Sequence, residues 1–392
     1  MTPRIKGGGF LERGFRPFFL LAGVYAIVAM ALWLLFLRGG LLLPGPMDPL
    51  SWHAHEMLFG FAGAAVAGFV LTAVPNWTGR LPLSGVPLLL LVLLWAAGRV
   101  LAVLPVPWGL AAAVDVAFPV TMSVVVVREV IAGSNWRNLP VGVALSLLAV
   151  ANAVDWLEWA FVLPDTGLGP RLGIAVLVSL ITLIGGRIVP SFTRNWLTQR
   201  KAAKLPEPFG RVDQAVLLVT VLALLTWTVE PRGWLVAALL ALAGVGNLVR
   251  LARWRGLATA AEPLVWILHV GYLFVPLALL LAAASAWRPD LVPDVAALHG
   301  LTAGAITMMI VAVMTRATLG HGGRPLHAGA LTTLVYGLLL IAAVSRVWAG
   351  LSEGLYLPLL LLSGGAWIGG FVLYLLRYGP IQVAPNRTPS GG

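Results

Sequence analysis

Residue types that bind metals gather where one apolar stretch begins. His53, His55, Glu56 and Met57 fall within a short segment, and the apolar run that they open continues to Val74. Imidazole is the common protein ligand of haem iron and also binds copper, and a thioether binds reduced copper. The sequence therefore places the ligand types of a haem or copper site at the end of one hydrophobic run.

The spacing within this segment limits how its histidines can bind. His53 and His55 are two residues apart, which separates them by about 200° around a helix, so both cannot bind one metal from the same face. We favour His55 as a ligand because it lies deeper in the run; the alternative for either residue is a capping or interfacial role. Met57 lies four residues after His53 and shares its face. A copper(I) site on this pair is therefore a prediction, with an ordinary core methionine as the alternative.

The composition is that of a membrane protein. Of the 392 residues, 59% are hydrophobic and 10% are charged, and the mean hydropathy is +0.93. A soluble core cannot bury this much apolar surface, so the solvent must be lipid. The absence of cysteine excludes disulfides, thiolate metal sites and covalent c-type haem. The net charge of +11 does not indicate a nucleic-acid partner, because the 26 Lys and Arg are scattered between the apolar runs.

Twelve apolar runs, bounded by Pro, Gly and Arg, predict the fold. Each is long enough to cross a bilayer roughly 30 Å thick as a helix. The runs cover residues 18–37, 54–74, 86–104, 108–127, 139–161, 171–189, 213–229, 233–252, 263–284, 295–315, 328–349 and 355–376. We expect an all-α polytopic membrane protein. Its predicted parts are an N-terminal segment, 1–17, a transmembrane domain, 18–376, and a tail, 377–392.

The basic residues predict the orientation. If both termini are cytoplasmic, most of the 26 Lys and Arg lie in cytoplasmic segments. The outer loops then hold four of them, Arg38, Arg171, Arg232 and Arg288. This imbalance follows the positive-inside rule, so we place both termini in the cytoplasm.

Ionisable residues inside the runs gather toward the outer leaflet in this orientation. Such residues are costly in a membrane unless they are paired or functional. Six runs carry them near their outer ends, namely His53 and His55, Arg99, Asp115, Asp155 and Glu158, His299, and Arg346. The pattern predicts one site in the outer third of the membrane.

His299 is the second candidate haem ligand. It precedes Gly300, which leaves room for a planar group, and its depth matches that of His55, as two axial ligands of one haem require. The alternative is a hydrogen bond between helices. His269 lies in the inner half of the membrane, where it could ligate a second cofactor or bond a neighbouring carbonyl.

Two arginines could neutralise haem propionates, which favour guanidinium contacts. They are Arg99 and Arg346. For Arg99, an ion pair with Asp115 across the tight turn at residues 104–107 is an equal alternative.

Several motifs together resemble the NnrS family. They extend from residue 15 to beyond residue 320 and therefore cover nearly the whole chain. The motifs are residues 15–20 (FRPFFL), 52–60 (WHAHEMLFG), 71–79 (LTAVPNWTG), 185–193 (GGRIVPSFT), 298–302 (LHGLT), 314–316 (MTR) and 319–326 (LGHGGRPL). The resemblance implies a twelve-helix protein of the bacterial inner membrane that carries haem b and copper and belongs to the nitric oxide response.

The layout is also distantly similar to the catalytic subunits of haem–copper oxidases. That likeness implies a haem held by His55 and His299 on the second and tenth helices. The chain departs from the pattern because the sixth and seventh runs have no histidine and the tenth has only His299. A standard binuclear centre for oxygen reduction is therefore not expected. Any copper would have to be held by other residues, for which the candidates are His53, Glu56, Met57 and His269.

Three hypotheses for function follow. The first is a haem-binding, copper-containing membrane protein that handles nitric oxide or relieves nitrosative stress, with nitric oxide reduction by an unidentified electron donor as one activity. The second is a proton-coupled secondary transporter with two six-helix halves, in which Arg99, Asp115, Asp155 and Glu158 form the proton path. The third is a non-catalytic haem or copper carrier.

Overall fold

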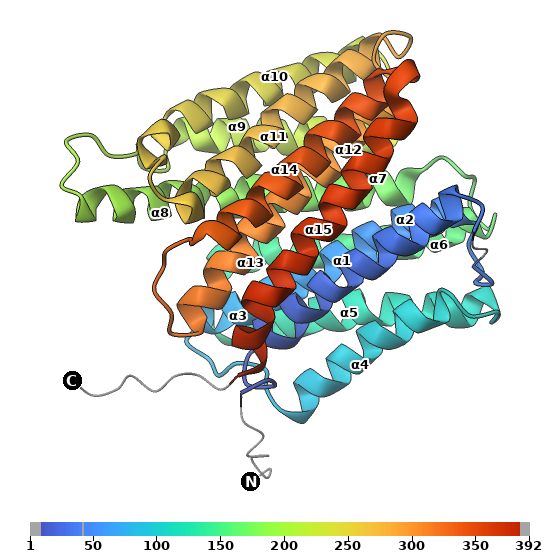
Figure 1. Ribbon diagram of the computed structural model, residues 1–392, viewed down its shortest axis with the longest axis horizontal. Coiled ribbons are helices and arrows are strands. Elements are labelled where there is room, and N and C mark those ends of the chain that lie inside the picture. The colour runs from blue at the N-terminus through green and yellow to red at the C-terminus, as the bar shows by residue number, and fades with distance from the viewer. Residues whose placement is uncertain (1–8, 41–42, 385–392) are drawn as a thin grey trace. The chain divides into compact units, whose positions relative to one another are not determined.

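A computed structural model describes residues 9–40 and 43–384 of the chain (Figure 1). The described part is helical throughout and contains no strand, which confirms the predicted all-α class. The α-helices are α1 (Phe15–Leu37), α2 (Pro49–His55), α3 (Gly63–Thr78), α4 (Val86–Leu101), α5 (Trp108–Ala132), α6 (Leu139–Trp159), α7 (Leu168–Leu180), α8 (Gly186–Gln199), α9 (Arg211–Val229), α10 (Trp234–Ala252), α11 (Pro263–Trp287), α12 (Asp294–His299), α13 (Thr307–His321), α14 (Ala330–Leu351) and α15 (Tyr356–Val383).

Shorter 3₁₀- and π-helical segments join or interrupt these helices. The 3₁₀ segments are η2 (Trp136–Asn138), η4 (Gly256–Thr259) and η6 (Glu353–Leu355). The π segments are η1 (Glu56–Ala62), η3 (Ile181–Gly185) and η5 (Gly300–Ile306). Each π segment continues one helix directly into another, so that α2, η1 and α3 form a single rod, as do α7, η3 and α8, and α12, η5 and α13.

Eleven helical segments of the described part are long and apolar enough to cross a membrane. The protein is therefore a multi-pass membrane protein. The predicted third run, 86–104, corresponds to α4, which is apolar but shorter than the other eleven. The predicted first and last runs are extended, because α1 begins at Phe15 and α15 ends at Val383. The ends of the predicted N-terminal segment and tail, at residues 1–8 and 385–392, lie outside the described residues.

The three π segments share a feature that the hydropathy pattern does not predict. Each has glycine at its fifth position, which is Gly60 in η1, Gly185 in η3 and Gly304 in η5. His55 immediately precedes η1, and His299 immediately precedes η5. Because π-helical turns are rare and frequently occur at functional sites, they support these two histidines as candidate site residues.

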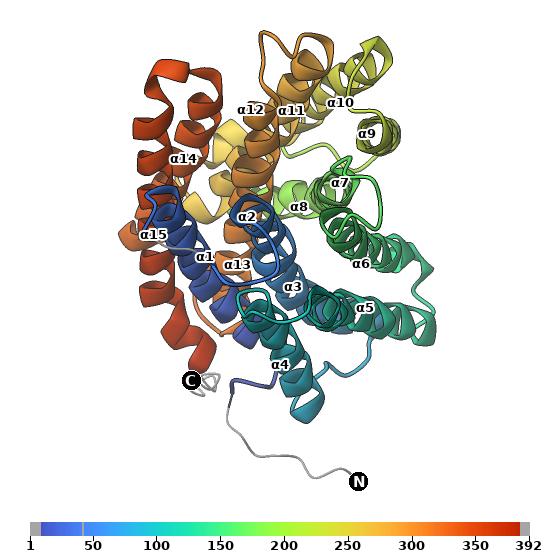
Figure 2. The same cartoon turned by 90° about the vertical axis from the view of Figure 1, so that its right-hand side faces the viewer.

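The chain folds into two compact units. Unit 1 contains the described residues of 9–173 together with 314–326 and 371–384, and unit 2 contains 174–313 and 327–370. In unit 1, α5 packs against both α4 and α6, and α1 packs against α3. The contact between α4 and α5 confirms the antiparallel hairpin predicted from their tight turn. In unit 2, α10 packs between α9 and α11 (Figure 2).

A buried arginine holds the two ends of unit 1 together. Arg16, in the FRPFFL motif, donates hydrogen bonds to the backbone carbonyls of Ile381 and Gln382, at 3.4 and 3.1 Å, and to that of Ala384. These carbonyls belong to the last turn of α15 and its end, where a helix leaves them without internal partners. The backbone N–H of Phe15 donates to Thr72 Oγ1 at 3.0 Å, so the same motif also fixes α1 against α3. This part of the motif is structural.

Replacing Arg16 by Ala should therefore destabilise the fold. Hydrogen bonds from a charged donor are worth about 1.5–3 kcal/mol each, so we expect a loss of roughly 3 kcal/mol and a fall of about 5 °C or more in the apparent Tm. The measurement is the thermal loss of the monodisperse peak in size-exclusion chromatography. Arg38→Ala, at the exposed opposite end of the same helix, is the matched control and should leave the Tm unchanged. Equal stability of the two variants would contradict the proposed role.

Candidate functional site

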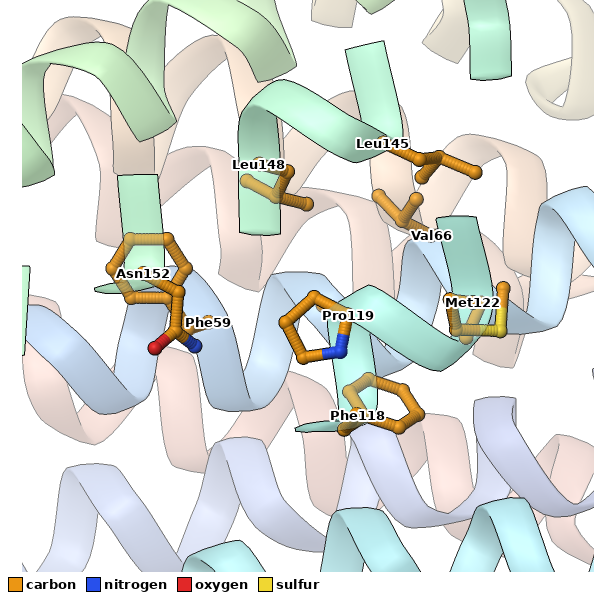
Figure 3. Close-up of a pocket in the computed structure, with 10 residues that line it drawn as sticks. Phe59, Val66, Phe118, Pro119, Met122, Leu145, Leu148 and Asn152 are labelled. Atoms are coloured by element: carbon orange, nitrogen blue, oxygen red, sulfur yellow. The ribbon is translucent and has the colours of Figure 1, made fainter. Parts of the chain in front are cut away.

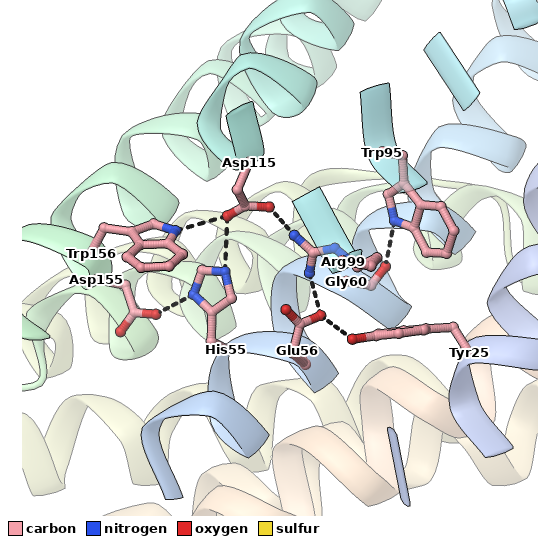
Figure 4. A network of polar contacts seen from close by, with 9 residues as sticks. All are labelled: Tyr25, His55, Glu56, Gly60, Trp95, Arg99, Asp115, Asp155 and Trp156. Atoms are coloured by element: carbon pink, nitrogen blue, oxygen red, sulfur yellow. Dashed lines mark hydrogen bonds and ion pairs between the residues drawn. The ribbon is translucent and has the colours of Figure 1, made fainter. Parts of the chain in front are cut away.

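His55 lies at the centre of a buried polar network in unit 1 (Figure 4). The residue is only 1% exposed. Its Nδ1 lies 2.6 Å from Asp155 Oδ2, and its Nε2 lies 2.9 Å from Asp115 Oδ2. The network thus connects the end of α2 with α5 and α6. The sequence placed all three residues toward the outer leaflet but did not predict that both ring nitrogens face carboxylates.

Arg99 continues the network toward η1 and α1. Its Nη2 donates to Asp115 Oδ1 and its Nη1 donates to Glu56 Oε2. The ion pair with Asp115, one of the two predicted alternatives for Arg99, is therefore present. Tyr25 OH also donates to Glu56 Oε2, and the indole N–H of Trp156 donates to Asp115 Oδ2 at 2.9 Å. We call Tyr25, His55, Glu56, Arg99, Asp115, Asp155 and Trp156 the His55 network.

The contacts of His55 determine how many protons the network holds. A neutral imidazole has one N–H and one acceptor nitrogen, whereas two ionised carboxylates can only accept. Two short contacts to Asp115 and Asp155 therefore require one further proton, either on the imidazole ring or on one of the carboxyl groups. In either form, no ring nitrogen of His55 has a lone pair directed away from the network. Ligation of haem iron by His55 would therefore require one of the two carboxylates to move away from its ring nitrogen.

The π segment η1 makes room for the network through Gly60. A Cβ atom built on Gly60 would lie 2.5 Å from Glu56 Oε2, 2.6 Å from Arg99 Nη1 and 2.8 Å from the ring of Tyr25. The carbonyl of Gly60 accepts a hydrogen bond from the indole N–H of Trp95 at 3.1 Å. Only a residue without a side chain fits at this position. The Gly60 carbonyl in this π turn is hydrogen-bonded by Trp95 of α4.

The copper candidates near His55 are not assembled into a site. The His53 ring stacks on the indole of Trp33, with 4.4 Å between the ring centroids and 15° between their planes. Met57 packs against an apolar cluster that includes Trp52 and Trp156. Across the described ranges, no group of three or more His, Asp or Glu residues is arranged to hold a metal ion. Copper binding stays a prediction.

His299, in unit 2, has a different environment from His55. Its Nδ1–H donates to the carbonyl of Val295 at 2.8 Å, which leaves Nε2 with a lone pair and no hydrogen-bond partner in the described part of the chain. Arg346, on α14, is close enough to act on His299 electrostatically, and its Nη1 is buried without a partner. The pairing of His55 with His299 on one haem stays a prediction, and the two residues belong to different units.

His269 also carries an unpaired nitrogen. Its Nε2 lies 2.8 Å from Thr193 Oγ1, whose only hydrogen is donated to the carbonyl of Val189 at 2.9 Å. The imidazole must therefore donate from Nε2, which leaves Nδ1 as the bare nitrogen. This Nδ1 is buried without a partner in a residue that is 7% exposed, and a Cβ built on Gly256 would lie 2.7 Å from it. The predicted hydrogen bond to a neighbour is present, although its acceptor is a hydroxyl.

Glu158, which the sequence placed among the ionisable residues near the outer leaflet, has a structural role. Its carboxylate accepts hydrogen bonds from the backbone N–H groups of Thr166, Leu168 and Gly169, at 3.0, 3.0 and 2.8 Å. These groups lie at the start of α7, where a helix has unpaired donors and favours a negative charge. Glu158 therefore caps α7, whereas Asp155, one turn earlier, faces His55.

The sequence did not predict a second buried ion-pair network, which lies in unit 2. Arg250 donates from Nε to Asp213 Oδ1 at 3.0 Å and from Nη1 to Tyr272 OH at 2.9 Å, and Tyr272 OH donates to Asn247 Oδ1 at 2.6 Å. A Cβ built on Gly186 would overlap the Arg250 guanidinium. The second glycine of the GGRIVP motif therefore leaves space for a buried arginine. This glycine is the feature of the sequence that could have indicated the space for a buried side chain.

These features define an all-helical, multi-pass membrane protein with charged networks buried among its helices. A family model described as NnrS protein matches residues 9–386, and the chain belongs to this family. Membership indicates a membrane protein of the nitric oxide response. No curated protein matches the chain.

Removing the Arg99 side chain should be strongly destabilising. Arg99→Met leaves Glu56 and Asp115 as buried carboxylates without their cation, which typically costs about 3–5 kcal/mol. Asp115→Asn combined with Arg99→Met should recover part of this loss, because one of the stranded charges is removed. The measurement is the apparent Tm of the single and double variants. Arg288→Ala, which removes an exposed ion pair with Asp290, is the control and should have no effect. Strictly additive effects at Arg99 and Asp115 would contradict the coupling.

Gly60→Ala should disrupt the His55 network without changing any charge. The added Cβ has no room beside Glu56 and Arg99, so we expect a loss of about 2 kcal/mol or more and a lower apparent Tm. Gly109→Ala is the matched control, because a Cβ there meets nothing within 4 Å in α5. Since alanine favours helix over glycine, the control should be neutral or slightly more stable. Two variants of equal stability would show that the close packing at Gly60 is not needed.

Proposed function

We propose that the chain is a haem-binding membrane protein that acts on nitric oxide, with His299 as an axial ligand. The observation that carries the proposal is the state of the His299 ring. Its Nδ1–H is held by the Val295 carbonyl, so the nitrogen with the lone pair is Nε2. This is the usual second contact of a metal-binding histidine, because it fixes both the tautomer and the ring orientation. Family membership supplies the link to nitric oxide.

The position of His299 and one neighbouring side chain support a haem here. The π segment η5 sets His299 at the start of a π turn, whereas Gly300 packs closely against α11, because a Cβ there would lie 3.0 Å from Ala278 Cβ. The unpaired Nη1 of Arg346 offers a donor for a haem propionate, in line with the preference of guanidinium for carboxylates. Haem iron with a free coordination position supplies nitric oxide binding, and nitric oxide reduction is the reaction that we propose. Copper has weaker support, since its candidate ligands are not assembled.

The proposed setting is the bacterial inner membrane, with twelve spans and both termini in the cytoplasm. The twelfth span would be α4, which is apolar but short. The asymmetric distribution of Lys and Arg supports the orientation.

A proton-coupled transporter is the second candidate function. It is favoured by the His55 network, in which ionisable side chains follow one another from Tyr25 through Glu56, Arg99 and Asp115 to His55 and Asp155 inside the membrane. Such chains of buried ionisable groups are typical of proton relays. Substrate uptake by vesicles that contain haem-free protein would favour this candidate over the first.

The test of the first candidate is the absorption spectrum of the purified protein with its matched histidine variants. We expect a Soret band and a positive pyridine haemochrome assay for the wild type. His299→Ala should lower haem affinity on the order of tenfold or more, whereas His327→Ala, at an exposed histidine paired with Glu262, should retain the band. A band that is unchanged in His299→Ala, or absent after haem-replete expression, would contradict the proposal. Steady-state nitric oxide consumption with an electron donor separates an enzyme from a haem carrier.

A further inference from the structure

A small cavity lies in unit 1 beside the His55 network (Figure 3). It is bounded by η1, α3, α5 and α6, with Phe59, Gly63, Phe118, Met122, Leu145 and Asn152 among its walls. Its volume is about 20 Å³, which is room for one small molecule. Phe59 connects the cavity to the network, since its ring centroid lies 5.0 Å from that of His55.

One polar side chain stands among these apolar walls. Asn152 is 1% exposed, and its Oδ1 is buried without a hydrogen-bond partner. A buried water usually makes about three hydrogen bonds, whereas this cavity offers a single side-chain amide. Oxygen and nitrogen of an amide are assigned from their partners, so either end of Asn152 can be turned toward a ligand. The cavity therefore suits a small uncharged molecule that needs one polar contact and apolar walls.

The space is created by a glycine that the backbone does not require. A Cβ built on Gly63 meets only the ring of Phe118, at 4.0 Å, which is ordinary van der Waals contact. By contrast, a Cβ on Gly68, one turn further along α3, would lie 2.6 Å from the ring of Phe19. Gly68 is therefore needed for packing, whereas Gly63 leaves a volume open that a larger residue could fill.

The helices that bound the cavity also carry exposed apolar side chains. Val120 follows the wall residue Pro119 in α5 and is 44% exposed. Leu147 precedes the wall residue Leu148 in α6 and is 38% exposed. Exposed apolar side chains on membrane-spanning helices face lipid. An uncharged molecule that dissolves in lipid can therefore approach α5 and α6 from the membrane.

We propose that this cavity binds one uncharged diatomic gas molecule, with the amide of Asn152 as its polar contact. The choice of nitric oxide as that gas rests on the proposed function, whereas the size and chemistry of the cavity do not. The cavity would hold nitric oxide taken from the lipid next to the His55 network.

The first experiment uses xenon, an apolar probe whose binding does not depend on haem. The full chain in lipid nanodiscs should show a bound-xenon signal in ¹²⁹Xe NMR. Gly63→Leu should lower xenon binding on the order of tenfold, because its side chain occupies the cavity. Gly63→Ala, which adds one methyl group without a close contact, should lower it less and guards against loss of the fold. Gly337→Leu is the matched control, since a Cβ there meets nothing within 4 Å, and it should bind xenon as the wild type does.

Equal xenon binding by the wild type and the two Gly63 variants would overturn the proposal, whatever the Soret band shows.

The second experiment tests the polar contact with nitric oxide as the probe. Asn152→Leu should keep xenon binding but shift the N–O stretching band of nitric oxide bound in the cavity. An identical band in the wild type and in Asn152→Leu would overturn the role of the amide. Absence of haem with intact xenon binding would contradict the proposed function alone.

Discussion

The bridge that Arg99 makes between two carboxylates is the interaction on which the inner organisation of unit 1 depends. Its guanidinium joins Glu56 of η1 to Asp115 of α5 in a low-dielectric interior. Asp115 in turn contacts His55 and Trp156, so that one cation fixes the positions of acidic and imidazole groups from several helices. Because buried ions are tolerated only when they are paired, the helices cannot separate without exposing these charges to lipid.

Two histidines with the same local setting thus have different chemistry. His55 and His299 each end a short α-helix and precede a π segment. Two carboxylates occupy both nitrogens of the His55 ring, whereas a backbone carbonyl holds one nitrogen of His299 and leaves the other with its lone pair. The groups that contact each imidazole ring therefore determine which of the two histidines can offer an electron pair to a metal. The residue type and its depth in the membrane do not.

Hydropathy and charge predicted the helical rods and most of their bounds, and they gave the Arg99–Asp115 ion pair as one of two alternatives for Arg99. They succeed because the length of an apolar run and the cost of a buried charge are properties of single segments. The same patterns could not predict that Asp155 faces His55 while Glu158 caps α7, because residues three apart on one face still meet different partners. Nor could they predict the pairing of Arg250 with Asp213, since the two residues lie near the ends of separate apolar runs and a hydropathy pattern does not show which run ends meet.

The three π segments recur at a regular interval along the chain. Three rods, α4 to α6, separate the rod of η1 from that of η3, and three more, α9 to α11, separate η3 from η5. A four-rod block used three times would give this spacing and would carry one glycine at the same place in each copy. Histidine then stands before the π turn in the first and third copies, and Leu180 stands there in the second. The backbone geometry of the π turn and its glycine therefore recur even where the preceding side chain differs.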